Sequence, residues 1–557
     1  MRCSRFFILS LLVAAGCELE AKSLGTKLAA GRDISNPSIV WTGSRPFVLF
    51  TVSDKQSELH AVPFDGESPV QALTQGFPCL GTARISNSGQ VVVDTCYGTI
   101  LVCDLESRTL VRSIAGSFDQ LQGDTLLFKR TFFGTDYSYL VQLPGGTEQV
   151  LGNISQAWFA PSGRLYFLLA GSVLGATDKA GATPNMSNRL VSSFVISPDE
   201  STAVVSDMQS SQDSNPQPSV FHVLGLPSYG ELMTLPLDNP YCTSCPWLGF
   251  SPDSRHFFYA ENAQEGPGVL HQYGVRDSQV LSAQSRPGPS LDGLLWSPSG
   301  DLALIGESEC ETGTAPLACQ DVYRSTLRLG PVLDPISTTV GDAIFSVDSS
   351  HLLFQDALSL GRVMVTSTSS LSPDPAADAT VLSPSGSLVD GATFDAATGT
   401  AVFWARPNGG KSSINIPGGS YERASLYAAS PPAFQVRRLA EEVDSVAIGR
   451  GVVVANVSFS PQNQTGDLVL YNLRSGQQRT LASPVSSFWV DVPVCLKPAP
   501  QSARSKRQSR WAGGATGSTA IVVPPGCPAD SPLLVTFTVR GPIVSDKDGL
   551  WAMTVQP

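Results

Sequence analysis

One order of apolar and polar positions returns along most of this chain. A large apolar residue is followed by a short polar corner, often Ser-Pro with Asp, Ser or Gly, and then by a run of consecutive apolar residues. The copy that starts at Trp296 has Ser-Pro-Ser-Gly at 297–300 and continues into an apolar run at 302–305. Proline presets the backbone for the second position of a type I turn, and glycine tolerates the exit geometry. Each corner therefore predicts a tight turn between two strands.

Neighbouring copies lie roughly 33 to 54 residues apart, within the range of propeller-blade repeats. They begin at Ile85, Phe118, Phe159, Ile196, Phe250, Trp296, Phe345, Phe394 and Val446. The runs after the corners, such as 91–93 and 257–259, are apolar on consecutive positions, whereas a strand with one wet face would alternate. This predicts strands covered on both faces, as when each propeller blade lies between two neighbours. An ordinary β-sandwich is the alternative. It is disfavoured because a sandwich does not require a long-period repeat, and this chain has one.

A second, looser strand follows most copies, as at 468–473, where a Leu-Tyr-like run ends before Ser475-Gly476. The whole pattern resembles the TolB-type, WD-like β-propeller repeat of bacterial envelope proteins. The resemblance covers most of the chain after about residue 38 and implies an all-β propeller over 38–557. About 10–11 blade-like repeats exceed the usual four to eight of one ring, so we expect either one large ring or two joined propellers divided near residue 240.

The N-terminus has the features of an export signal. Arg2 and Arg5 precede an apolar stretch too short to span a bilayer as a mature helix, and small residues follow. Residues 14–17, Ala-Ala-Gly-Cys, resemble a bacterial lipobox, which implies a signal peptide over 1–16 and a lipid on Cys17. An ordinary signal peptide that ends near a cysteine is the alternative. Residues 17–37 show little periodicity and are predicted to form a tether.

This signal implies that the protein is located in the bacterial cell envelope. Under the sorting rule of enteric lipoproteins, Glu18 after the cysteine implies the outer membrane. The net charge of −12 and pI near 5.0 disfavour nucleic acid as a partner, because its phosphates would be repelled. Strong attraction to an anionic membrane surface is disfavoured for the same reason, so we expect membrane contact through the lipid anchor only.

Cysteine spacing gives three candidate disulfides. Cys310 and Cys319 flank a Gly/Pro-bearing loop, and Cys495 and Cys527 flank the longest irregular insertion, whose segment 498–519 is predicted to be a flexible loop. Cys242 and Cys245 have thioredoxin-like spacing, but Pro246-Trp247 follows instead of a helix, which favours a local disulfide or two thiols. One of the remaining Cys79, Cys96 and Cys103 is left over in any pairing.

The motifs of common enzymes do not occur. The sequence has no G-x-S-x-G elbow, no H-x-x-x-H pair and no glycine-rich phosphate loop, so no catalytic, cofactor or metal residue is assigned. The five histidines, expected one to a repeat, could still converge on a central channel. We expect a non-catalytic binding or scaffolding module for protein partners. A propeller enzyme, lactonase-like or glycan-cleaving, with its site in the channel is the alternative.

Overall fold

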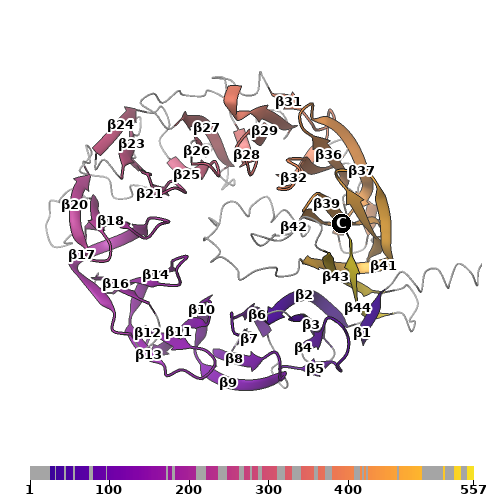
Figure 1. The fold of residues 1–557 in the computed structure, drawn as a ribbon, viewed down its shortest axis with the longest axis horizontal. Coiled ribbons are helices and arrows are strands. Elements are labelled where there is room, and N and C mark those ends of the chain that lie inside the picture. Colours follow the sequence, from indigo (N-terminus) through magenta and orange to yellow (C-terminus); the bar gives the residue numbers. More distant parts are fainter. Residues whose placement is uncertain are drawn as a thin grey trace, which may run out of the picture.

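Short antiparallel strands follow one another around a central axis, as Figure 1 shows for the computed structural model of this chain. The structure describes residues 25–556 except 32, 43–44, 54–56, 75–79, 96, 171–172, 179–181, 208–220, 236–246, 262–268, 276–278, 286–290, 301, 310–319, 329–339, 357–361, 371–378, 407–413, 417–418, 422–423, 461–462, 492–517, 521–531 and 541–547. The predicted all-β propeller built from blade-like repeats is confirmed.

Five sheets have four strands, and each is one repeat of the pattern. Figure 1 shows the first strand of each near the axis and the last at the rim. The five sheets consist of β2 (Ile34–Thr42), β3 (Arg45–Ser53), β4 (Ser57–Pro63) and β5 (Gln71–Ala72); β6 (Leu80–Ile85), β7 (Gln90–Thr95), β8 (Thr99–Asp104) and β9 (Thr109–Ala115); β10 (Ser117–Gln122), β11 (Thr125–Phe132), β12 (Thr135–Gln142) and β13 (Gln149–Gly152); β21 (Trp247–Phe250), β22 (His256–Glu261), β23 (Val269–Gly274) and β24 (Gln279–Ser285); β32 (Leu388–Phe394), β33 (Ala401–Arg406), β36 (Ala424–Ser430) and β37 (Gln435–Val443). A two-stranded sheet, β34 (Ile414–Ile416) with β35 (Gly419–Tyr421), lies between β33 and β36 in the chain. We call each such repeat a unit.

Two sheets have seven strands, and each holds two units. The first comprises β14 (Ile154–Phe159), β15 (Leu165–Leu169), β16 (Val173–Thr177), β17 (Asn185–Ile196), β18 (Thr202–Asp207), β19 (Phe221–Gly225) and β20 (Gly230–Leu235). The second comprises β25 (Leu291–Trp296), β26 (Leu302–Glu309), β27 (Gln320–Arg328), β28 (Val340–Phe345), β29 (His351–Asp356), β30 (Arg362–Ser367) and β31 (Thr380–Val381), with a 3-10 turn at Thr368–Ser370. Strand β17 ends one unit and begins the next, because its first half pairs with β16 and its second half with β18. The units therefore outnumber the sheets.

An eight-stranded sheet closes the ring by joining the two ends of the chain. It comprises β1 (Thr26–Ala30), β38 (Ser445–Gly449), β39 (Val452–Ser460), β40 (Thr465–Asn472), β41 (Gln478–Asp491), β42 (Ser518–Ala520), β43 (Leu533–Val539) and β44 (Gly549–Val555). Strand β1 pairs with β44, and Trp41 Nε1 donates to Asp491 Oδ2 at 3.1 Å across the same junction. Strand β1 lies inside the 17–37 segment predicted as a tether, so residues 26–30 are part of the fold instead. Its five residues were too few to show a pattern.

The hydrophobic core lies between units, as the uninterrupted apolar runs predict. Strand β15 is buried at four of its five positions, and β33 at five of its six. One cluster joins Leu28 and Val48 to Leu550 near the chain ends, and another joins Val204 and Phe221 to Phe257 across residue 240. Figure 1 shows β20 and β21, which flank that residue, as neighbours in one ring.

The antiparallel order gives the ring two different faces. The first and second strands of a unit meet at the polar corner, as where Phe345 pairs with Leu352 across 346–351. The second and third strands meet at the opposite end, as where Asp356 pairs with Arg362. We call the first side the corner face and the second side the loop face. The connections between second and third strands range from two residues after Phe132 to seventeen after Arg406, the latter including β34 and β35.

Candidate functional site

The repeated corner is the first candidate site, because its serines and aspartates recur. At 251–256 the buried Ser251 hydroxyl donates to Asp253 Oδ1 at 2.6 Å and accepts the backbone N–H of His256 at 2.9 Å. Ser197 and Ser346 make the same pair of bonds in their own corners. The fourth corner position has a positive φ, +90° at Gly163 and +60° at Ser349, which is the exit geometry that favours glycine. The corner serine is thus a structural cap.

A second set of hydrogen bonds connects neighbouring corners around the ring. The backbone N–H of the third corner position donates to a side chain in the next unit, and the distances are between 2.6 and 3.0 Å. These bonds run from Ser88 to Asp124, from Ser162 to Glu200, from Asp199 to Ser254 and from Ser299 to Ser349. Between β32 and β38 the direction reverses, since Gly451 N–H donates to Asp395 at 3.0 Å. The corner motif therefore holds units together.

Hydrogen bonds hold three corner aspartates in the charged form. Hydrogen bonds from Ser346 Oγ and Ser350 lower the pKa of Asp348 to about 2. At Asp199 and Asp253 burial works in the opposite direction, yet hydrogen bonds from Ser197 and Ser251 still leave both pKa values below the usual range. A carboxylate with a lowered pKa is a poor proton acceptor near neutral pH. These groups fit a structural role better than acid–base chemistry.

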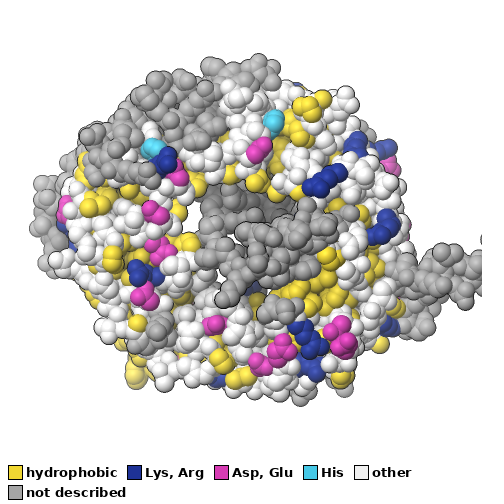
Figure 2. All heavy atoms as spheres, viewed as in Figure 1, with side chains coloured by type: hydrophobic (Ala, Val, Ile, Leu, Met, Phe, Trp, Pro, Cys, Tyr) yellow, Lys and Arg dark blue, Asp and Glu magenta, His cyan; other side chains and the backbone are white. Residues whose placement is uncertain are grey.

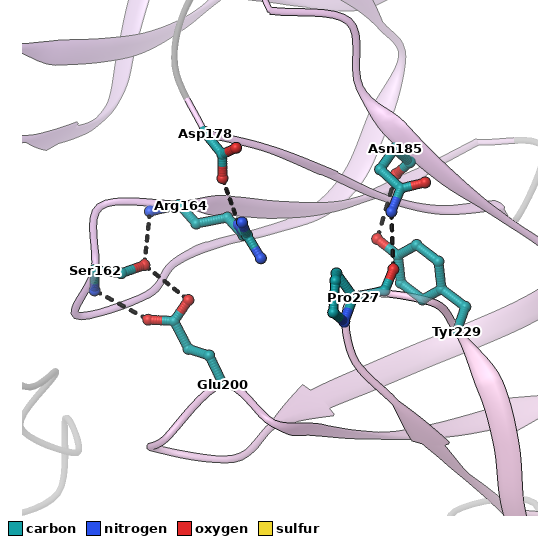
Figure 3. Close-up of polar contacts among 7 residues, drawn as sticks. All are labelled: Ser162, Arg164, Asp178, Asn185, Glu200, Pro227 and Tyr229. Atoms are coloured by element: carbon teal, nitrogen blue, oxygen red, sulfur yellow. Dashed lines mark hydrogen bonds and ion pairs between the residues drawn. The ribbon is translucent and has the colours of Figure 1, made fainter.

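A polar cluster joins the two units of the β14–β20 sheet (Figure 3). The Glu200 carboxylate accepts Ser162 N–H at 3.0 Å and Ser162 Oγ–H at 2.7 Å, and Arg164 Nε donates to Asp178 at 2.5 Å. On the other side of the cluster, Asn185 Nδ2 donates to the Pro227 carbonyl at 2.8 Å. The first two pairs join segments that turn between strands, and the third joins the start of β17 to the turn at Pro227, so the cluster fixes these turns in place.

Two buried tyrosines lie beside this cluster. Burial raises the pKa of Tyr166 and raises that of Tyr229 to about 12, while Arg164 opposes the shift at both. Tyr229 Oη donates to the Asn185 carbonyl at 3.3 Å. A phenol with a raised pKa stays protonated near neutral pH and acts as a hydrogen-bond donor. Tyr229 therefore supports the start of β17 at Asn185, and neither phenol offers a base near neutral pH.

The histidines occupy two positions of the repeat. His60, His222 and His271 lie in third strands, whereas His256 and His351 begin second strands. His256 and His271 share the β21–β24 unit, so the expectation of one histidine to a repeat is wrong. Third strands lie towards the rim, and the His271 ring stacks on Tyr259 at 4.5 Å instead of converging on the channel. Across the described parts of the chain, no group of three or more His, Cys, Asp or Glu could hold a metal ion.

Cys103 is free and buried in the structure, and burial raises its pKa to about 12. Cys79 and Cys96 lie outside the described residues, so the expectation that one of these three cysteines is left over stays a prediction. The Cys103 thiol donates to the Leu73 carbonyl at 3.4 Å, so Cys103 behaves as a small core residue. Cys17 and the candidate pairs lie outside the described residues; these are Cys242 with Cys245, Cys310 with Cys319 and Cys495 with Cys527.

The loop face carries a feature that sequence reasoning missed. Phe132 ends β11, and the two-residue connection Phe133-Gly134 leads into β12, with φ of +50° and +80°. Such a turn favours Asn-Gly or Gly-Gly, and a bulky residue at positive φ is an outlier. Phe133 is fully exposed. A Phe-Phe-Gly run between two strands was the available signal, but without the pairing register it looks like ordinary strand.

Among the described residues drawn in Figure 2, acidic and basic side chains are interspersed around the ring, with apolar side chains between them, and neither sign forms one large patch. Some charged groups of the described residues form ion pairs, including Lys129 with Asp119 at 3.3 Å and Arg112 with Glu148 at 2.7 Å. A surface with interspersed charges exerts little long-range attraction on polyanions or polycations.

Comparisons with known proteins give no family. No family model and no curated protein matches the sequence. Among solved structures, a eukaryotic initiation factor is similar at 11% identity, covering 79% of this chain and 99% of that one with a TM-score of 0.41. The dihydro-heme d1 dehydrogenase NirN complex is similar at 17% identity, over 58% and 72% of the two chains with a TM-score of 0.32. Kuenenia stuttgartiensis hydrazine synthase is similar at 9% identity, over 66% and 96% with a TM-score of 0.29.

These scores are low, so the fold assignment rests on the sheets of this chain itself. The TolB-type resemblance stays a prediction. Within the described ranges, no helix combines the length and apolar character needed to cross a membrane.

Proposed function

We propose that this chain is an exported lipoprotein of the bacterial cell envelope, attached to the outer membrane through Cys17, whose propeller binds protein partners without catalysing a reaction. The contrast between its two faces is the observation that carries the proposal. Corner residues are engaged in hydrogen bonds within and between units, whereas the loop face joins its strands by connections of unequal length. Loops displayed by a rigid scaffold are where binding residues concentrate in propellers and similar folds.

The polar clusters support binding over catalysis. The corner carboxylates of Asp199, Asp253 and Asp348 have lowered pKa values, and the buried Tyr166 and Tyr229 have raised ones. Catalytic acids and bases instead have pKa values brought towards the working pH. These pKa shifts keep the aspartates charged and the tyrosines neutral near neutral pH, which fits a structural role in a scaffold.

The anchor is tested by radioactive palmitate labelling in a bacterial host. The parent chain should incorporate label and fractionate with the outer membrane, and Cys17→Ser should lose the label because the acceptor thiol is gone. The control is Cys103→Ser, whose thiol is buried in the fold and should leave labelling unchanged. Equal labelling of the parent and Cys17→Ser would remove the lipoprotein part of the proposal.

A further inference from the structure

The strongest unexplained surface feature is the tip of the β11–β12 hairpin. Phe133 is fully exposed, the neighbouring Phe132 is 48% exposed, and Tyr137 on the returning strand is also exposed. Tyr97, in the equivalent connection of the β6–β9 unit, is 70% exposed. Both connections join a second strand to a third, so these aromatic residues lie on the loop face. Contiguous exposed aromatic side chains mark interaction sites more often than single apolar residues do.

The tip is held in shape by contacts below it. Phe132 and Tyr137 meet edge to face with ring centroids 6.1 Å apart, and Thr131 Oγ1 donates to Asp136 Oδ1 at 2.6 Å. The Arg130 guanidinium lies over the Tyr139 ring at 4.7 Å. A projection that is already ordered loses little conformational entropy when it binds. Phe133 has a positive φ, which costs conformational energy for a bulky side chain. Residues in such strained conformations concentrate at functional sites, which favours a binding role for this side chain.

The charges near the tip disfavour a polyanion or an anionic membrane as its partner. Lys129 is paired with Asp119 at 3.3 Å, and Arg130 is paired with Glu148 at 2.6 Å. Anionic lipid and nucleic acid are recognised through lysine and arginine that are available to them. The aromatic tip therefore offers apolar surface, while Lys129 and Arg130 next to it are engaged in ion pairs with Asp119 and Glu148.

The exit of the chain places the membrane on the other side of the ring. Thr26 pairs with Ala552, and Ala30 pairs with Gly549, the first residue of β44. Strand β41 ends one unit and begins the next, as β17 does, because its first half pairs with β40 and its second half with β43. Strands β43 and β44 are therefore the second and third strands of the last unit, so β44 starts at the loop face and the chain before Thr26 leaves from the corner face. From Cys17 to Gly25 an extended chain reaches at most about 28 Å. If Cys17 is lipidated, as proposed above, the bilayer adjoins the corner face and the loop face points away from it.

We infer that the β11–β12 tip is the docking point for a protein partner that offers an apolar pocket to Phe133. The inference rests on the proposed lipid-anchored binding function and names the face and residue that carry it. Buried aromatic anchors surrounded by weaker contacts dominate typical protein interfaces. Tyr97 extends the same surface across the neighbouring unit.

The test uses the full chain in the bacterial envelope. A photo-reactive phenylalanine analogue replaces Phe133, and in a second strain it replaces Val347, which is 60% exposed in a corner on the opposite face. We expect a discrete protein adduct from position 133 and none of that mass from position 347. The captured protein is then identified, purified and titrated against the detergent-solubilised chain.

Two matched substitutions decide the outcome. Phe133→Asn removes the ring but suits a positive φ before Gly134, so its unfolding midpoint should be no lower than that of the parent. It should weaken binding of the purified partner at least about tenfold, whereas Val347→Asn should leave the affinity within about twofold. Equal affinity of the parent and Phe133→Asn would overturn the inference, as would a lipid adduct at position 133.

Failure of the inference and failure of the proposed function give different results. A partner captured at position 347, with palmitate incorporated at Cys17, retains the anchored binding module and overturns the docking point. Loss of palmitate labelling removes the anchor, and with it the argument for which face points away from the membrane.

Discussion

At the scale of single residues, the corner motif explains its own composition. Serine at the first position caps the turn, aspartate at the third accepts several hydrogen bonds, and the fourth position takes a positive φ. The corner at 346–350 shows all three roles, because Asp348 accepts bonds from Ser346 and Ser350 while Ser349 has a φ of +60°. Sequence predicts the turn from this composition. It does not predict that Ser349 also accepts a hydrogen bond from Ser299 in the unit before it.

Asp348 gives a prediction about pH. Its pKa falls from the usual 3.8 to about 2 in the folded chain, so its contribution to stability is present above pH 3.8 and is lost as the pH falls through 2. The side chain is exposed, so solvent screening limits the effect of Asp348→Ala to about 0.5–1 kcal/mol at pH 7. Urea unfolding at pH 7 and at acid pH should show that difference shrinking. A difference that is unchanged down to pH 2 would contradict the charge-based account.

At the scale of elements, the short N-terminal strand has a large effect on closure. Strand β1 covers the exposed edge of β44, and Leu28 packs with Val48 and Leu550. Close contact is possible because Gly549 has no side chain: a Cβ there would lie 2.1 Å from the Ala29 carbonyl oxygen. Neither the pairing nor the need for glycine is visible in the sequence, because the two strands are separated by almost the whole chain.

This contact predicts the effect of Gly549→Ala. The added methyl group would clash with the β1 backbone, and its φ of +150° also disfavours alanine. We expect a loss of about 2–4 kcal/mol in the free energy of unfolding, and faster hydrogen exchange in β1. Gly31→Ala is the control, because its φ is +129° but its Cβ would meet no described atom within 4 Å. If both variants lose the same stability, backbone strain alone accounts for the effect.

At the scale of the whole molecule, the ring depends on contacts between successive units. The hydrophobic clusters lie between units, and the corners add hydrogen bonds along one face. The cluster of Leu28, Val48 and Leu550 joins the two ends of the chain into the same arrangement. A unit without its neighbours would expose apolar surface on both sides of its sheet, so closure is a condition for stability.

Removal of β1 should therefore affect the whole ring. A chain that begins at Ile34 loses the strand that covers β44 and the buried Leu28, whereas a chain that begins at Gly25 keeps both. We expect the shorter chain to lose about 2–4 kcal/mol in unfolding free energy and to associate as its concentration rises, because an open strand edge is exposed. Equal stability and equal sedimentation of the two chains would show that β1 is dispensable for closure.

The sequence by itself determined the strands, the corners and the double burial of the second strands, because each depends on a few neighbouring residues. Val91 and Phe257 are apolar within consecutive runs, and both are fully buried. Only the tertiary structure decided which units share a sheet, how β1 meets β44, and that Phe133 projects from the loop face while the N-terminal segment leaves from the corner face. Those outcomes depend on pairing register and on contacts between residues far apart in the chain, which local patterns do not specify.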